Sequence, residues 1–332
     1  MKAAVIGSGA WGTALALCLC KNGHDVTMWT FEKELIDEMR TTRRNPRLAN
    51  VTLPENLKIS GDYACAQDCK LVVIASPSFP MRSVCRGVAP YIDNDAVVVS
   101  VTKGIEDGTL LRMSQIVQQE TGKSVVVLTG PSHAEEVARG VPTACLAASP
   151  FREKAELVQD AFMCEAFRIY TSPDIVGAEL GGAIKNVIAL CAGISDGIGG
   201  GDNTKAMLIT RGLTEMARLG VSLGASRETF AGLAGIGDLT VTCTSRHSRN
   251  NRAGLLIGRG LSPEEAMAEI GGVVEGYYAA KSVRELAQRQ GVDMPIVNAA
   301  YAVLHEGHST SDVAVMLMQR KRKAESEDVG WL

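Results

Sequence analysis

The residue that most directly suggests chemistry in this 332-residue sequence is a lysine inside an apolar stretch. The run from Ala183 to Ile198 is apolar almost all round, which predicts a buried helix, and Lys185 and Asn186 lie near its start. A buried ammonium group is costly unless it is paired or used, so Lys185 is a candidate for proton transfer. The alternative is that Lys185 reaches the surface, with its stem along neighbouring side chains.

A second lysine and a glycine turn follow strand-like runs. Lys103 comes directly after one such run, and the turn from Gly130 to Glu136 comes after the next. Ligands of an open α/β sheet gather beyond the carboxyl ends of its strands, so Lys103 is expected to face a ligand. The Gly130 turn leads into a helix and offers free amide donors for an anion. An exposed loop lysine is the alternative for Lys103.

The second half of the chain contains a group of polar residues that suits a phosphate. Ser248, Arg249 and Asn250 offer a hydroxyl, a forked guanidinium and an amide in succession, downstream of the segment Gly235–Leu239. Arginine binds phosphate oxygens bidentately, so this set predicts a phosphate site. A solvated surface turn is the alternative.

The start of the chain predicts a dinucleotide-binding unit. Gly7 permits a tight turn, Gly9 lets the backbone approach a pyrophosphate, and Gly12 lets the helix pack close to the strand. The amide donors and dipole of that helix favour phosphates. The expected strand, helix and strand are Ala3–Ile6, Thr13–Asn22 and Asp25–Trp29. A glycine-rich turn without a ligand is the alternative.

Strand-like and helical segments continue to alternate after this unit. The expected further strands are Leu71–Ala75, Ala96–Val101 and Val125–Leu128, with helices around Met81–Tyr91 and Thr109–Thr121 and edge strands at Thr143–Ala148 and Phe167–Thr171. Apolar strands separated by helices indicate a parallel, doubly wound sheet. The segment Thr41–Asn56 is expected to be an exposed connection.

The character of the sequence changes after Ser172-Pro173. From there the chain lacks strand-like runs and is expected to form helices with glycine breaks, as at Gly220, Gly224, Gly260 and Gly291. The fold class is therefore α/β, a Rossmann-type doubly wound parallel sheet followed by an all-α C-terminal domain. We expect a dinucleotide-binding domain at residues 1–172 and a helical substrate-binding and catalytic domain at 173–332.

Composition excludes several classes of protein. A hydrophobic content of 46% with 21% charge is ordinary for a soluble protein, and a net charge of −3 argues against nucleic acid as a partner. No signal peptide or membrane-spanning run is evident, so we expect a cytoplasmic protein without membrane insertion. The nine cysteines, mostly in apolar runs, are expected to be reduced, and no ligand spacing predicts a metal site.

Several long motifs give the sequence a family resemblance. In chain order they are GSGAWGTALAL, SVTKGIE, LTGPSHAEEVARG, GAELGGAIKNVIAL, GISDGIGGGDNTKAMLITRGLTEM, AGIGDLTVTCTSRHSRN and GGVVEGYYAAK. This series resembles the NAD(P)-dependent glycerol-3-phosphate dehydrogenases of bacteria, from residue 3 to about residue 320. The resemblance implies reversible reduction of dihydroxyacetone phosphate to sn-glycerol 3-phosphate, which supplies glycerophospholipid synthesis. It also implies a homodimer.

The resemblance also implies roles for individual residues. Lys185 would be the catalytic acid–base group, and Lys103 would add a second positive charge that helps to lower its pKa. The positions that match substrate contacts are Lys103, Gly130, Ser132, Lys185, Asp238, Ser248, Arg249 and Asn250. The cofactor positions, together with the glycines Gly7, Gly9 and Gly12, are Ala10, Trp11, Phe31, Lys103, Ala134, Arg249, Val273 and Glu275.

One departure bears on the choice between NAD and NADP. Members that favour NADPH often carry a histidine–arginine pair after the second strand, where this sequence has Phe31-Glu32. An acidic side chain there would bind the adenine-ribose 2′-hydroxyl and repel a 2′-phosphate. Either NAD is the cofactor, or Arg40, Arg43 or Arg44 meets the phosphate. We expect NAD to be accepted at least as well as NADP.

Two other functions compete with this one. A reductase of a different keto or sugar-acid substrate would lack the phosphate set around Arg249. A non-catalytic dinucleotide sensor would bind the cofactor without turnover, and it would leave Lys185 in its apolar helix without a purpose.

Overall fold

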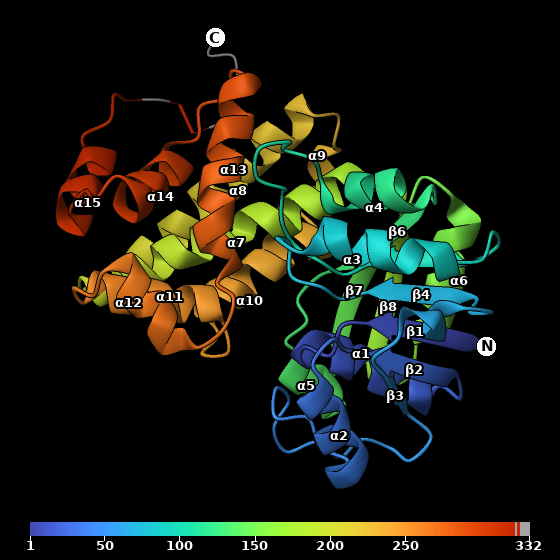
Figure 1. Cartoon of the computed structure of the whole chain (residues 1–332). Helices are drawn as coiled ribbons and strands as arrows, with labels where there is room; N and C mark the ends of the chain where they lie inside the picture. The colour runs from blue at the N-terminus through green and yellow to red at the C-terminus, as the bar shows by residue number, and fades with distance from the viewer. Residues whose placement is uncertain (323, 326–332) are drawn as a thin grey trace.

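The computed structural model describes residues 1–322, 324 and 325. A twisted sheet with flanking helices forms the first half of the chain, and a group of helices forms the second (Figure 1). The expected Rossmann-type α/β fold with a helical C-terminal part is confirmed. Residues 323 and 326–332 of the expected second domain lie outside the described residues.

The sheet has eight strands in the order β3-β2-β1-β4-β5-β6-β7-β8. The strands are β1 (Lys2–Ile6), β2 (Asp25–Trp29), β3 (Lys58–Ser60), β4 (Leu71–Ile74), β5 (Val97–Ser100), β6 (Val125–Thr129), β7 (Thr143–Ala148) and β8 (Phe167–Ser172). Neighbouring strands run parallel except β6 and β7, which are antiparallel. The two expected edge strands therefore extend the sheet, with one reversal of direction.

Helices cover both faces of this sheet. They are α1 (Ala10–Lys21), α2 (Lys33–Thr42), α3 (Met81–Val88), α4 (Met113–Thr121), α5 (Ala134–Ala138) and α6 (Arg152–Phe162), with short 3₁₀ turns η1 (Tyr63–Ala66) and η2 (Ala89–Tyr91). Alternate residues of β1 face opposite layers: Val5 packs in the cluster that holds α1 and α6, and Ile6 in the cluster that holds α3 and α4. Burial on both faces explains the continuous apolar runs of the central strands.

The second half is helical. Its elements are α7 (Ile175–Gly197), α8 (Asp202–Ser222), α9 (Arg227–Phe230), a π-helical turn η3 (Leu233–Gly237), α10 (Asp238–Thr244), α11 (Arg249–Gly258), α12 (Pro263–Ile270), α13 (Glu275–Arg289), α14 (Pro295–His305) and α15 (Thr310–Met318). Helix α7 contacts α8, α10, α11 and α13. By length and composition α7 could cross a membrane, but 83% of its most apolar window is buried inside the protein, as in a core helix.

Close packing against α7 depends on glycine. A Cβ at Gly193 would overlap the carbonyl oxygen of Asn251, and one at Gly254 would overlap that of Leu190. The backbones of α7 and α11 therefore touch directly, in a way that no larger residue would permit.

Three expectations about the elements need correction, and one strand was missed. Strand β3 was not expected, because three residues carry too little pattern. Helix α4 begins at Met113 and not at Thr109, because Leu110 has a positive φ of 59°. Gly220 lies inside α8 against Phe230 and does not end a helix. The connection 41–56 is only partly exposed, since Asn45, Leu48 and Leu53 are buried.

Candidate active site

Helix α7 places the candidate catalytic residue Lys185 in the interior of the protein. Asp174 caps its start by accepting a hydrogen bond from the Gly177 amide. One face of α7 then presents Gly181 and, four residues on, Lys185. A Cβ at Gly181 would overlap the carbonyl oxygen of Ala234 in the turn η3, so glycine allows this turn to lie against α7.

Lys185 does not reach the surface. Its side chain is 7% exposed, and its Nζ donates hydrogen bonds to Asp238 Oδ1 at 2.5 Å and to Thr242 Oγ1 at 2.6 Å. Asp238 begins α10 directly after the π-helical turn, and π turns are common at functional sites. The snorkelling alternative for Lys185 is therefore wrong.

Lys103 reaches the same carboxylate from the other half of the chain. Its Nζ donates to Asp238 Oδ2 at 2.6 Å and to the carbonyl oxygen of Gly130 at 3.2 Å. A Cβ at Gly182 would lie 3.2 Å from Lys103 Cγ, so the bare backbone of α7 leaves room for the lysine stem. The structure thus joins the ends of β5 and β6 to α7 and α10 through one buried carboxylate.

The electrostatics of this group are those of a proton-transfer site. Burial, with a smaller effect of Lys103, lowers the pKa of Lys185 to about 8, although Asp238 opposes the shift. Burial alone would raise the pKa of Asp238, but the two ammonium groups outweigh it and the pKa is lowered. With both lysines protonated and the carboxylate ionised, the group has a net positive charge, which can stabilise an oxyanion.

The glycine turn after β6 lies beside these lysines. Gly130 has a φ of +148°, and a Cβ there would lie 3.0 Å from the Cα of Cys145. Ser132 Oγ donates to the Gly130 carbonyl oxygen at 3.0 Å. The ring of His133, in the same turn, lies 5.7 Å from that of His247, so the turn faces the segment before α11.

The Ser-Arg-Asn set is more structural than its residue types suggest. Ser248 caps α11 by accepting a hydrogen bond from the Asn251 amide, and it is 3% exposed. Asn250 donates to Asn186 Oδ1 at 3.0 Å and accepts from the Gly276 amide at 2.8 Å. Arg249 is exposed at the start of α11, with its Nη1 3.1 Å from where a Cβ of Gly272 would be. Arg249 is therefore the member best placed to bind a phosphate.

The glycine-rich turn fits a dinucleotide. A Cβ at Gly7 would overlap the carbonyl oxygen of Ala75, and one at Gly12 would overlap that of Gly7. These contacts place the turn between the ends of β1 and β4, the strands where the sheet order reverses and where ligands of such sheets bind. A Cβ at Gly9 would meet nothing within 4 Å, and Ser8 Oγ is buried without a hydrogen-bond partner among the described residues. Open backbone and a spare hydroxyl suit a pyrophosphate.

The other expected cofactor positions differ in environment. Ala10, Trp11 and Ala134 pack between α1 and α5. Phe31 is 74% exposed beyond β2. Val273, which precedes α13, is half-buried.

Glu275, at the start of α13, is tied to the dinucleotide-binding half. Its carboxylate accepts hydrogen bonds from Ser78 N at 3.0 Å and Ser78 Oγ at 2.6 Å. Burial raises the pKa of Glu275 despite these bonds and the charge of Arg249. The turn after β4 therefore meets α13. The turn after β5 lies at the same place, because a Cβ at Gly104 would lie 2.5 Å from Ser78 Cβ and 3.7 Å from Glu275 Oε2.

Thr242 and His133 are site residues that sequence reasoning missed. Thr242 stands four residues after Asp238 on α10, and that spacing could have identified it. The Nε2 of His133 is buried without a hydrogen-bond partner among the described residues, and burial followed by the charge of Lys185 lowers the pKa of His133. Residue type alone gave no signal for His133. Within the described residues, no three His, Cys, Asp or Glu side chains are grouped to hold a metal.

A Rossmann-type sheet, a fitting glycine-rich turn and a buried lysine–carboxylate group together define a nicotinamide-dinucleotide-dependent oxidoreductase. Two family models match the chain: NAD-dependent glycerol-3-phosphate dehydrogenase N-terminus over residues 2–155, and the corresponding C-terminus over residues 174–315. The chain belongs to this family.

Individual relatives agree with this assignment. A protein of Thermoanaerobacter sp. (strain X514) named Glycerol-3-phosphate dehydrogenase NAD(P)+ is 50% identical over 98% of this chain and 99% of its own length. One of the same name from Pelotomaculum thermopropionicum is 51% identical over 99% and 96%. The crystal structure of glycerol-3-phosphate dehydrogenase from Coxiella burnetii has a TM-score of 0.92 at 39% identity and covers 96% of this chain and 98% of that one.

Proposed function

We propose that this chain catalyses the reversible reduction of dihydroxyacetone phosphate to sn-glycerol 3-phosphate with NADH or NADPH. The observation that carries the proposal is the group formed by Lys103, Asp238 and Lys185 at the junction of the two halves. The names of the relatives supply the substrate.

The protein's own residues divide the work as follows. A nicotinamide held by the glycine-rich turn would supply a hydride to the carbonyl carbon, and the substrate oxygen would then carry negative charge. Lys185 donates a proton to that oxygen, for which a pKa of about 8 is well matched to neutral pH. Lys103 adds a second positive charge, and Asp238 holds both ammonium groups in place. In the reverse direction neutral Lys185 accepts the proton of the alcohol.

The remaining assignments complete the proposed site. Arg249 binds the substrate phosphate, while Ser248 and Asn250 fix the start of α11, and Gly130 and Ser132 form the adjacent wall. The cofactor is held by Gly7, Gly9, Ala10, Trp11, Gly12, Phe31, Ala134, Val273 and Glu275, with Lys103 and Arg249 next to it.

The wider setting is also part of the proposal. Residues 1–172 form the dinucleotide-binding domain and 173–332 the substrate domain. The protein works in the cytoplasm as a homodimer, without membrane insertion, and supplies glycerophospholipid synthesis. The burial of α7 supports the absence of membrane insertion.

The test is a rate measurement with purified protein. Dihydroxyacetone phosphate should drive the oxidation of NADH or NADPH, and the unphosphorylated ketone should be much poorer. A faster reaction with 2-keto acids or sugar acids than with dihydroxyacetone phosphate would identify the protein as another kind of reductase. Binding of the nucleotide without turnover of either class would favour a sensor.

A further inference from the structure

The loop after α2 is anchored to the glycine-rich turn. Asn45 is 2% exposed, and its Nδ2 donates to the carbonyl oxygen of Ser8 at 2.9 Å and to Thr13 Oγ1 at 2.7 Å. Its Oδ1 accepts a hydrogen bond from the Arg47 amide at 3.0 Å. Arg47 is therefore fixed, through one buried side chain, beside the turn that fits a pyrophosphate.

The side chain of Arg47 crosses to Glu32 at the end of β2. Its Nη2 lies 2.6 Å from Glu32 Oε1 and 2.7 Å from Oε2. Glu32 occupies the N-cap position of α2 but makes no cap hydrogen bond there, so Arg47 is the partner that holds its carboxylate. The two side chains are 43% and 29% exposed, so separating them costs little.

Two other arginines expected near this place are already engaged. Arg40 donates to the carbonyl oxygen of Ile59 at 2.7 Å, and Arg43 donates to those of Pro54 and Leu57. Both hold the loop to the backbone around β3. Arg44 is exposed, and its backbone pairs with Thr52.

We propose that Glu32 and Arg47 form a cofactor-selecting pair that lets one site accept both NAD and NADP. Glu32 accepts the adenine-ribose 2′-hydroxyl of NAD, as an acidic residue at this position of the fold does. With NADP, Arg47 turns from the carboxylate to the 2′-phosphate and offsets the repulsion by Glu32. The inference rests on dinucleotide binding, and not on which carbonyl is reduced.

The proposal predicts opposite effects on NADP binding when Arg47 is removed and when the charge of Glu32 is removed. Without Arg47, the carboxylate of Glu32 remains and nothing offsets its charge, so only the phosphorylated cofactor is disfavoured. Without the charge of Glu32, Arg47 is released and the phosphorylated cofactor gains. A purely structural salt bridge between α2 and the loop would affect both cofactors alike.

Equilibrium binding measurements test these effects on cofactor affinity without any need for turnover. NADH and NADPH are each titrated into the purified chain, with the nucleotide fluorescence as the signal. Arg47→Ala should weaken NADPH binding by at least about tenfold and change NADH binding by less than about threefold. Glu32→Gln should tighten NADPH binding by at least about threefold and weaken NADH binding.

Two variants serve as comparisons. Lys58→Ala removes a cation from an exposed ion pair with Asp25, in which Lys58 Nζ lies 2.7 Å from Asp25 Oδ1. This pair lies at the starts of β2 and β3, away from Glu32 at the end of β2, so the affinities for NADH and NADPH should both stay unchanged. Equal changes for NADH and NADPH in Arg47→Ala, or a selective loss in Arg44→Ala in its place, would overturn the proposal. Failure of the unaltered chain to bind either nucleotide would overturn both this inference and the proposed function. If that chain binds both and the variants do not discriminate, only this inference is overturned.

Discussion

Gly181 and Lys185 lie one helical turn apart on the same face of α7, and both meet the segment that ends in Asp238. The carbonyl oxygen of Ala234 occupies the space where a side chain of residue 181 would begin, and the Lys185 ammonium group donates to Asp238. Because Gly181 has no side chain, this segment can lie against α7, and that contact positions the Asp238 carboxylate that Lys185 binds.

Gly181→Ala should damage catalysis through this geometry. A Cβ would push η3 away from α7, and overpacking of this kind costs about 1–3 kcal/mol of stability. Displacement of Asp238 by even ~1 Å should lower kcat by roughly a hundredfold. Steady-state rates and denaturant unfolding measure the two effects.

The matched control is Gly201→Ala, at the N-cap of α8. Gly201 has a φ of −98°, and a Cβ there meets nothing within 4 Å. It should retain the rate, and its only expected cost is that of a poorer N-cap residue, about 0.5–1 kcal/mol of stability. Similar behaviour of the two variants would contradict the role given to Gly181.

The rates of ketone reduction and of alcohol oxidation should depend on pH in opposite ways. Protonated Lys185 serves reduction, so kcat/KM for dihydroxyacetone phosphate should fall as the pH rises through about 8. Neutral Lys185 serves oxidation of the alcohol, whose rate should rise over the same range. Initial rates from pH 6 to pH 10 in both directions provide the check. Profiles that move in the same direction would argue against a single acid–base group.

Asp238→Asn should shift those profiles. Burial lowers the pKa of Lys185, whereas the charge of Asp238 raises it. Removing that charge should therefore move the midpoint of both pH profiles below 8. An unchanged midpoint, with only a lower maximum rate, would show that a different group titrates.

Arg249→Ala should discriminate between substrates. If Arg249 binds the phosphate, activity on dihydroxyacetone phosphate should fall by at least about tenfold, whereas the weak activity on dihydroxyacetone should change little. Arg246→Ala, in the same segment and also exposed, provides the comparison. Because Arg249 also matches a cofactor position, NADH affinity is measured in parallel. Equal losses on both ketones would remove Arg249 from phosphate binding.

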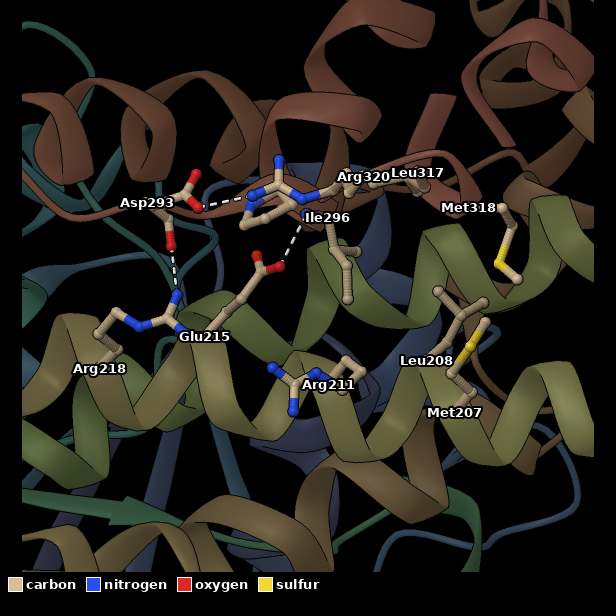
Figure 2. Close-up of a pocket in the computed structure, with 11 residues that line it drawn as sticks. Met207, Leu208, Arg211, Glu215, Arg218, Asp293, Ile296, Leu317, Met318 and Arg320 are labelled. Carbon is tan, nitrogen blue, oxygen red and sulfur yellow. Dashed lines mark hydrogen bonds and ion pairs between the residues drawn. The ribbon is translucent and has the colours of Figure 1, made fainter. Parts of the chain in front are cut away.

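Glu215 should make folding stability depend on pH. Figure 2 shows this α8 side chain in a pocket with Arg211 and Arg218, where it accepts hydrogen bonds from Ile296 N at 2.8 Å and Val297 N at 3.3 Å. Burial raises the pKa of Glu215 from 4.5 to about 7, so the folded state binds more protons between these values. Stability should therefore fall as the pH rises through this window, by an amount on the order of 2–3 kcal/mol.

Glu215→Gln keeps an acceptor at this position but does not titrate. Denaturant unfolding at pH 5 and pH 8 should show the unaltered chain losing stability relative to the variant. Parallel stabilities of the two proteins at both pH values would mean that Glu215 is ionised in the folded state throughout.

The sequence was most informative where function depends on local pattern. The order of strand, glycine turn and helix around Gly7 identified the dinucleotide unit, because each glycine answers a short-range steric need. Lys185 stood out because a charge in an apolar helix demands a partner. The resemblance gave Asp238 only as a substrate contact; its pairing with Lys185 came from the structure, since residues 53 positions apart have no local pattern in common.

Other features depend on contacts that no local pattern records. Two of the three predicted phosphate ligands also have structural partners: Ser248 caps α11, and Asn250 donates a hydrogen bond to Asn186 of α7. Arg47 had no distinguishing signal until the loop brought it to Glu32. Strand β3 is defined by its pairing with β2 and not by its three residues.

The most direct test of the central claim is the turnover of Lys185→Met, which keeps an unbranched apolar stem and removes the ammonium group. Lys281→Met serves as the control, because Lys281 is half exposed and pairs only with Asp107 among the described salt bridges. The reduction of dihydroxyacetone phosphate should fall by at least about a hundredfold in Lys185→Met, with NADH affinity retained, and stay near normal in Lys281→Met. Near-normal turnover of Lys185→Met would contradict the account.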